Sequence, residues 1–396
     1  MRLAGQRGLD WHNFFVANVQ TGFGPFIAVY LTSEAWTQRA IGTALSVGTI
    51  TAIISQLPGG AVVDALANKR LAAFVSCVAI AASALMFALW PEWLPVVAAE
   101  VLHGFASSML APAIAAMSLA LVGRAALGER LGRNARFAAI GSSLAAGVMG
   151  VVGSWVSEAA VFYLTAALMA PAIAALRSIP ARGSAAPEPA RAEGGLLAAA
   201  RLLLSWPVLV FAGCVALFHL GNAAMLPLVA AQLTKAVGAR ASLVIAACIV
   251  LPQLLVAWAS PFVGRAADRW GRRPVLLLSF LAVPVRGVLL AIFDSPAAVV
   301  VVQLLDGVSA AGFGVMLPLM AADLTRGTNR FNLCMGVFGL AAGLGATVST
   351  TAAGGIADRA GPGYALAALA GAGLASVLLV AVGVQETAPS VERARS

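Results

Sequence analysis

Long apolar stretches, separated by short polar breaks, run through the whole of this chain. Each is about 20 residues or longer, which is the length that an α-helix needs to cross a bilayer. Alternation of apolar and polar residues, typical of strands, is absent, and a helix satisfies its own backbone hydrogen bonds in lipid. We therefore expect about twelve membrane-spanning helices, at residues 11–32, 38–63, 71–90, 94–122, 137–157, 159–179, 206–234, 240–264, 275–293, 297–323, 331–354 and 362–384.

A longer polar segment that contains Pro187 and Pro189 interrupts the apolar pattern after residue 180. Proline among small and polar residues is typical of a linker. The chain is thus predicted to have four parts, namely an N-terminal six-helix bundle at residues 1–180, a cytoplasmic linker at 181–205, a C-terminal six-helix bundle at 206–388 and a cytoplasmic tail at 389–396.

Composition excludes a soluble protein. Of the 396 residues, 61% are hydrophobic and 10% are charged, whereas soluble proteins carry about 25% charged residues. The first helix lacks a small-residue cleavage site, so we expect it to be retained in a multi-pass membrane protein. The compact loops and the lack of organelle signals indicate a bacterial cytoplasmic membrane.

The net charge of +9 indicates topology, not nucleic-acid binding. With the N-terminus placed in the cytoplasm, most of the 25 Lys and Arg residues fall in loops and helix ends on the cytoplasmic side. Such a bias is the positive-inside rule, and it predicts that both termini are cytoplasmic. The lipid bilayer, with its anionic headgroups, is the partner that this charge implies.

No pattern for catalysis, a cofactor or a metal ion is present. The chain has no Gly-x-x-x-x-Gly-Lys phosphate loop and no Ser or Cys triad with local spacing. Its four cysteines are far apart, lack metal spacing and fall within apolar segments, which indicates buried free thiols. We therefore predict that the protein is not an enzyme and has neither a cofactor nor a metal site.

A polar sequence occurs twice, each time between two apolar segments. Residues 60–70 read G-A-V-V-D-A-L-A-N-K-R, and residues 264–274 read G-R-A-A-D-R-W-G-R-R-P. Other pairs recur in the correct order at nearly the same spacing, such as Gly104 with Gly307 and His103 with Asp306. Repeats of half the chain are how secondary transporters are built.

The second copy closely resembles the loop G-x-x-x-D-R-x-G-R-R between helices 2 and 3 of the major facilitator superfamily. The resemblance implies an all-α membrane protein with twelve helices in two pseudo-symmetric six-helix bundles. It also implies that the two hairpins lock the cytoplasmic side while the outside is open. The gating residues would be Gly60, Asp64, Arg70, Gly264, Asp268, Arg272 and Arg273.

Resemblance to the drug/proton antiporter branch is partial. Its R-x-x-Q-G motif in helix 4 here reads Glu100-Val101-Leu102-His103-Gly104, with Glu for Arg and His for Gln. The Gly-Pro pair usual in helix 5 of these antiporters is also missing.

The superfamily lines its central cavity with helices 1, 4, 7 and 10, and these segments hold most of the polar residues inside apolar stretches. Ionisable groups inside a membrane are costly and usually face a cavity or a partner. The candidates for proton coupling are Asp306, Glu100, His103 and His219. The candidates for substrate binding are Asn18, Gln20, Phe23, Asn222, Met225 and Gln303.

Asp306 is the leading proton carrier, because it lies near the middle of its helix, where a carboxyl group is less costly to bury when protonated. The alternative is an Asp that holds two helices together permanently. Glu100 and His103 share one helix face and form either a proton relay or an internal ion pair. Arg286, in the middle of helix 9, is expected to pair with an acidic group or to line a polar pocket.

The leading hypothesis is proton-coupled efflux of a small organic molecule by alternating access, carried out by a monomer. One alternative is proton-symport uptake or uniport of a specific metabolite. A second is a membrane receptor that has a transporter-like fold and transports nothing.

Overall fold

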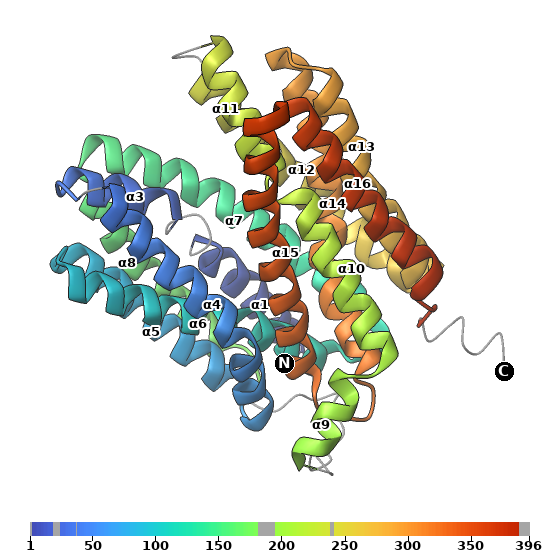
Figure 1. Ribbon diagram of the computed structural model, residues 1–396. Coiled ribbons are helices and arrows are strands. Elements are labelled where there is room, and N and C mark those ends of the chain that lie inside the picture. Colours follow the sequence, from blue (N-terminus) through green and yellow to red (C-terminus); the bar gives the residue numbers. More distant parts are fainter. Residues whose placement is uncertain (1, 19–23, 37, 181–194, 238–240, 388–396) are drawn as a thin grey trace. The chain divides into compact units, whose positions relative to one another are not determined.

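The computed structural model of the protein describes residues 2–18, 24–36, 38–180, 195–237 and 241–387. Every regular element in these ranges is a helix (Figure 1). Eleven helices in this part of the chain are long and apolar enough to span a membrane. Many large apolar side chains on them are exposed, such as Trp155, Leu94 and Val382, as a lipid environment requires. The prediction of an all-α membrane protein is confirmed.

Two compact units make up the chain. The first comprises Met1–Leu127, Arg136–Arg191 and Gly327–Gly336, and the second comprises Gly128–Ala135, Ala192–Arg326 and Val337–Ser396. The boundary at Arg191 lies inside the predicted linker. Each unit thus includes the first turns of one helix that otherwise belongs to the other unit, namely α15 (Phe331–Ala360) for the first and α7 (Leu127–Trp155) for the second.

The first half of the sequence forms the helices α1 (Arg2–Val16), α3 (Gly24–Ser33), α4 (Gln38–Ala65), α5 (Lys69–Leu89), α6 (Trp93–Val122), η1 (Arg124–Ala126), α7 and α8 (Glu158–Leu176). Aromatic rings bind α3, α5 and α8 together in the core. The Phe162 ring stacks on Phe87, with centroids 5.4 Å apart, and its centroid lies 5.1 Å from that of Tyr30.

The second half forms the helices α9 (Gly195–Leu203), α10 (Trp206–Asn222), α11 (Met225–Val237), α12 (Ala241–Trp270), α13 (Arg272–Ile292), α14 (Pro296–Leu324), α15 and α16 (Pro362–Gly383). Its packing repeats that of the first half. Helix α12 packs on α14 as α4 packs on α6, and α13 packs on α14 and α16 as α5 packs on α6 and α8. Figure 1 shows α13 and α16 side by side. The sequence repeat is therefore a repeat of helix packing.

Two of the predicted spans differ from single helices. In the span predicted at 11–32, α1 begins at Arg2 and ends at Val16, and α3 begins at Gly24. In the span predicted at 206–234, α10 ends at Asn222 and α11 begins at Met225. Hydropathy alone does not detect the second break, because Pro227 is apolar yet has no N–H group to donate to the carbonyl of Ala223 one turn earlier.

Helix α7 begins ten residues before the predicted start at residue 137, at Leu127. Its first turns are polar, so an apolar pattern cannot delimit them. Within this polar stretch, Arg130 Nε donates to Asn134 Oδ1 at 2.9 Å, one helical turn along.

Replacement of Gly307 tests the packing of α14 on α12. A methyl group at this position would lie 2.7 Å from the Pro252 carbonyl oxygen and 3.0 Å from Leu255 Cβ. We expect Gly307→Ala to destabilise the protein by about 1–3 kcal/mol, measured as a lower midpoint of thermal unfolding in detergent. Gly314→Ala on the same helix is the control, because nothing described lies within 4 Å of a methyl group there. Equal midpoints for the two variants would contradict the assignment.

Candidate functional site

The guanidinium group of Arg286 is the centre of a polar cluster inside the second unit. Only 2% of this side chain, in the middle of α13, is exposed. Its Nη1 forms an ion pair with Asp306 Oδ1 on α14. Its Nη2 donates to the side-chain oxygen of Asn222 at 2.7 Å and to the main-chain oxygen of the same residue at 3.2 Å. A buried charge is tolerated when it is paired and hydrogen-bonded in this way.

The cluster brings together three of the predicted site residues. Arg286 Nε lies 3.2 Å from Met225 Sδ, so Asp306, Asn222 and Met225 all contact one guanidinium group. The Asp306 side chain is 30% exposed, in contrast to its buried partner. Arg286 itself was expected to find an acidic partner, and the structure identifies that partner as Asp306.

His219 and Gln303 keep polar atoms without partners. The His219 ring packs edge-on against Phe313, with centroids 4.8 Å apart. Its Nε2 has no hydrogen-bond partner among the described residues, and the same holds for both amide atoms of the fully buried Gln303. Buried polar atoms are usually hydrogen-bonded, so these atoms are available to water or to a ligand.

The side chains of Glu100 and His103 lie next to different groups. The carboxyl group of Glu100 fills the space that a side chain at Gly48 of α4 would occupy. Its Oε1 has no hydrogen-bond partner in the described part of the chain. His103 Nε2 instead lies 3.2 Å from Ser107 Oγ, one turn along α6.

The predicted residues of the first span are only partly described. Asn18 Nδ2 donates to the carbonyl oxygen of Phe15, so the amide nitrogen is hydrogen-bonded within its own segment of the chain. Gln20 and Phe23 lie outside the described residues.

Asp64, in the first hairpin, binds the beginning of α15. Its Oδ1 accepts hydrogen bonds from the Asn332 main-chain N–H at 3.0 Å and from Asn332 Nδ2 at 2.6 Å. Its Oδ2 accepts from the Leu333 N–H at 2.8 Å. The first turn of a helix has free N–H groups and a partial positive charge, so a carboxylate is a favourable partner there. Gly60 lets the two segments meet, because a Cβ would clash with the Asn332 carbonyl.

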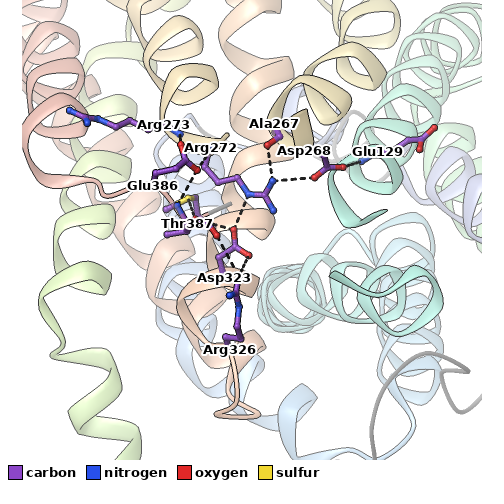
Figure 2. Close-up of polar contacts among 10 residues, drawn as sticks. Glu129, Ala267, Asp268, Arg272, Arg273, Asp323, Arg326, Glu386 and Thr387 are labelled. Atoms are coloured by element: carbon purple, nitrogen blue, oxygen red, sulfur yellow. Dashed lines mark hydrogen bonds and ion pairs between the residues drawn. The ribbon is translucent and has the colours of Figure 1, made fainter. Parts of the chain in front are cut away.

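Asp268, in the second hairpin, repeats this arrangement at α7 and adds an ion-pair network (Figure 2). Its Oδ2 accepts from the Glu129 N–H at 3.2 Å, and its Oδ1 lies 3.1 Å from Arg272 Nη1. Arg272, with 2% exposure, also places Nε 2.9 Å from Asp323 Oδ2. Gly264 packs against the Gly128 carbonyl as Gly60 packs against that of Asn332.

Two residues that follow α16 join this network, and sequence reasoning missed both. Glu386 accepts from the N–H groups of Arg272 at 2.7 Å and of Arg273 at 3.1 Å. Thr387 Oγ1 lies 3.0 Å from Asp323 Oδ2 (Figure 2). The available signal was Gly271, the N-cap of α13, which has no side chain to accept from these N–H groups.

The basic residues of the first hairpin are used differently. Asn68, which aligns with Arg272, caps α5 by accepting from the Arg70 N–H at 3.1 Å. Lys69 Nζ donates to the carbonyl oxygens of Val63 and Asp64. Arg70 was expected to pair with acidic groups, yet its Nε has no hydrogen-bond partner among the described residues. In the second hairpin, Arg273 reaches the Ala381 carbonyl through Nη2.

All four cysteines are buried and free, as their apolar surroundings indicated. Within the described residues, no three His, Cys, Asp or Glu side chains are placed to hold a metal ion.

Removal of the Glu386 carboxylate tests its role as the cap of α13. We expect Glu386→Ala to lower the free energy of unfolding by about 1–3 kcal/mol, because two backbone N–H groups lose a charged acceptor. Thermal unfolding in detergent and hydrogen exchange at the start of α13 measure this effect. Gln385→Ala, at the exposed neighbouring position, is the control. Unchanged protection of the Arg272 and Arg273 amides in Glu386→Ala would contradict the capping role.

Sequence comparisons cover nearly the whole chain. The family model of the Major Facilitator Superfamily matches residues 12–234 and 211–396. An uncharacterized MFS-type transporter of Mycobacterium tuberculosis, found in strains CDC 1551 and H37Rv, is 36% identical over 408 residues. This similarity covers 98% of the present chain and 95% of the relative.

Solved structures with the same fold include the human organic anion transporter MFSD10 (TETRAN), with a TM-score of 0.74, 14% identity and coverage of 96% of this chain and 99% of that one. The proton:xylose symporter XylE has a TM-score of 0.75, also at 14% identity, with coverage of 98% and 96%. These structures support the fold alone, whereas the family model and the mycobacterial relative establish descent. The chain therefore belongs to the Major Facilitator Superfamily, whose members are membrane transporters and not enzymes.

Proposed function

We propose that this transporter of a small substrate exports an organic molecule in exchange for protons, and that Asp306 carries the proton. The observation that carries the proposal is the ion pair between Asp306 and Arg286 inside membrane-spanning helices. Acidic groups at such depth are expensive and mark ion pathways by default.

The two partners of this ion pair differ in exposure, and the difference suits proton exchange. The carboxylate is 30% exposed and the guanidinium group is 2% exposed. The Asp306 carboxylate is thus partly open to its surroundings, while Arg286 is enclosed by the protein.

The surroundings of the ion pair favour an amphipathic substrate. Met225 contacts Arg286, and the rings of Phe218 and Phe313 stack with centroids 4.8 Å apart beside His219. Aromatic and methionine side chains adapt to ligands of varied shape. Gln303 and His219 supply polar atoms that are free to orient the ligand.

The hairpins are the proposed gate. Asp64 and Asp268 each hold the free N–H groups at the start of a helix, α15 and α7 respectively. Because these contacts are hydrogen bonds between a carboxylate and a helix end, they can open and close without leaving a charge buried. The proposal includes a monomer in a bacterial cytoplasmic membrane with both termini in the cytoplasm.

Asp306→Asn tests the proton role in purified protein reconstituted into liposomes with an internal pH dye. The panel contains amphipathic cations, neutral drugs and carboxylated metabolites, added under an imposed proton gradient. We expect a substrate-dependent proton flux in the wild type and at least about a tenfold loss in Asp306→Asn, because an amide cannot bind and release the proton. Asp294→Asn, which removes an exposed carboxylate just before α14, should leave the flux unchanged.

Each other result rejects part of the proposal. Full flux in Asp306→Asn would remove Asp306 as the proton carrier. Proton and substrate movement in the same direction would replace export with symport uptake. A receptor would be favoured by two results together. The reconstituted protein would show no flux for any compound, and cells with Asp306→Asn or Glu100→Gln would keep their phenotype.

A further inference from the structure

The seventh membrane span is broken between α10 and α11, at the point where the Arg286 cluster lies. Pro227 cannot donate a hydrogen bond to the Ala223 carbonyl, so the helix cannot continue normally through this segment. At the same break, the Ala224 N–H donates to Ser349 Oγ on α15 at 3.1 Å. Backbone bonds from the Ala223 N–H to the His219 carbonyl and from the Leu228 N–H to the Ala224 carbonyl flank the break. A side chain from a neighbouring helix thus supplements the helix's own hydrogen bonds there.

Arg286 supplies the second of these supports. Its Nη2 binds the main-chain oxygen of Asn222, the last residue of α10, and the side-chain oxygen of the same residue. Its Nε contacts Met225, the first residue of α11. One guanidinium group thus contacts both sides of the break while its Nη1 pairs with Asp306.

We propose that Arg286 is a positioning residue that makes the α10–α11 break respond to the charge on Asp306. This inference rests on the proposed role of Asp306 as the proton carrier. While Asp306 is charged, the ion pair fixes the plane of the guanidinium group. The other edge of this group then stays bound to Asn222 and Met225 at the break. When Asp306 is protonated, the break loses this support and bends.

The physical reason is the cost of a buried cation without a counterion. Removing one partner of a buried ion pair leaves the other charge uncompensated. Protonation of Asp306 has this effect on Arg286, which then turns toward water or another acceptor. Because the guanidinium group is planar and rigid, its two ends cannot move independently, and the Asn222 oxygens lose their donor. Breaks at element ends are where helices bend in conformational changes.

The groups around Asp306 identify it as the acid to which the break responds. Arg286 faces it from α13. Helix α10 contributes the His219 ring, which lies against the same helix as Asp306, two turns further on. Helix α12 packs against α14 at Gly307 through Leu255 and the Pro252 carbonyl. The titratable residue of α12 nearest in sequence to this contact is Cys248, which is buried. The test therefore separates titration of Asp306 from that of His219.

The experiment is amide hydrogen exchange of the full-length protein in lipid nanodiscs, read on peptides that cover residues 222–228. Rates at neutral and acid pH are corrected for intrinsic exchange. In the wild type we expect acid pH to raise exchange across the break about tenfold. Asp306→Asn should show the raised rate at both pH values, and Asp306→Glu should restore the wild-type pH response.

Three controls locate the effect. Ser349→Ala removes the other support, so exchange should rise at both pH values while the response to pH persists. Arg286→Lys should lose the response of exchange to pH, because one ammonium group cannot hold Asp306 and both Asn222 oxygens. This variant tests the inference by itself if Asp306→Asn does not fold. Protection of α5 should stay constant in every variant, which excludes global unfolding.

The outcomes separate this inference from the proposed function. A pH response that survives in Asp306→Asn overturns the inference and points to His219 or another group. Loss of proton flux in Asp306→Asn with wild-type exchange at the break also overturns it, and leaves Asp306 as the proton carrier. Retained flux in Asp306→Asn rejects the proposed function, whatever the break does.

Discussion

The structure depends on one constraint, namely that lipid offers no hydrogen bonds, so backbone polar groups and charges buried in a membrane protein are stabilised by partners within the protein. Helix beginnings are the most demanding places, because their first N–H groups have no partner in the helix. Three carboxylates meet this need, since Asp64, Asp268 and Glu386 bind the first turns of α15, α7 and α13. The same constraint explains why Arg286 has partners along both edges of its guanidinium group.

The two halves of the chain meet this constraint in different ways despite their shared packing. The helix after the first hairpin is capped by its own Asn68, whereas the helix after the second is capped by the distant Glu386. The second hairpin also has an ion-pair network through Arg272 and Asp323. In the register set by Gly104 and Gly307, the first half has Ala120 at the position of Asp323. The two halves therefore share their helix packing but differ in the charged groups of their hairpins.

The polar cluster around Arg286 connects the proposed proton carrier to a break in a membrane helix. A partly exposed acid and a helix break both lie within hydrogen-bond distance of one buried cation. If the acid exchanges protons, a change of one charge acts directly on the shape of a membrane helix. Such direct contact is the simplest way to couple an ion to a conformational change, because the ligand needs only to favour one of two states.

The sequence by itself determined the helical membrane fold, the internal repeat and the family, because hydropathy, repeated motifs and glycine positions are local properties of the chain. It also offered Asp306, Asn222 and Met225 as separate candidates for the site. Only the tertiary structure decided that Arg286 joins them, that α10 ends at Asn222, and that Glu386 caps α13. These features depend on residues far apart in the sequence, and a hydrogen bond or an ion pair depends on distances of a few Å that no linear pattern specifies.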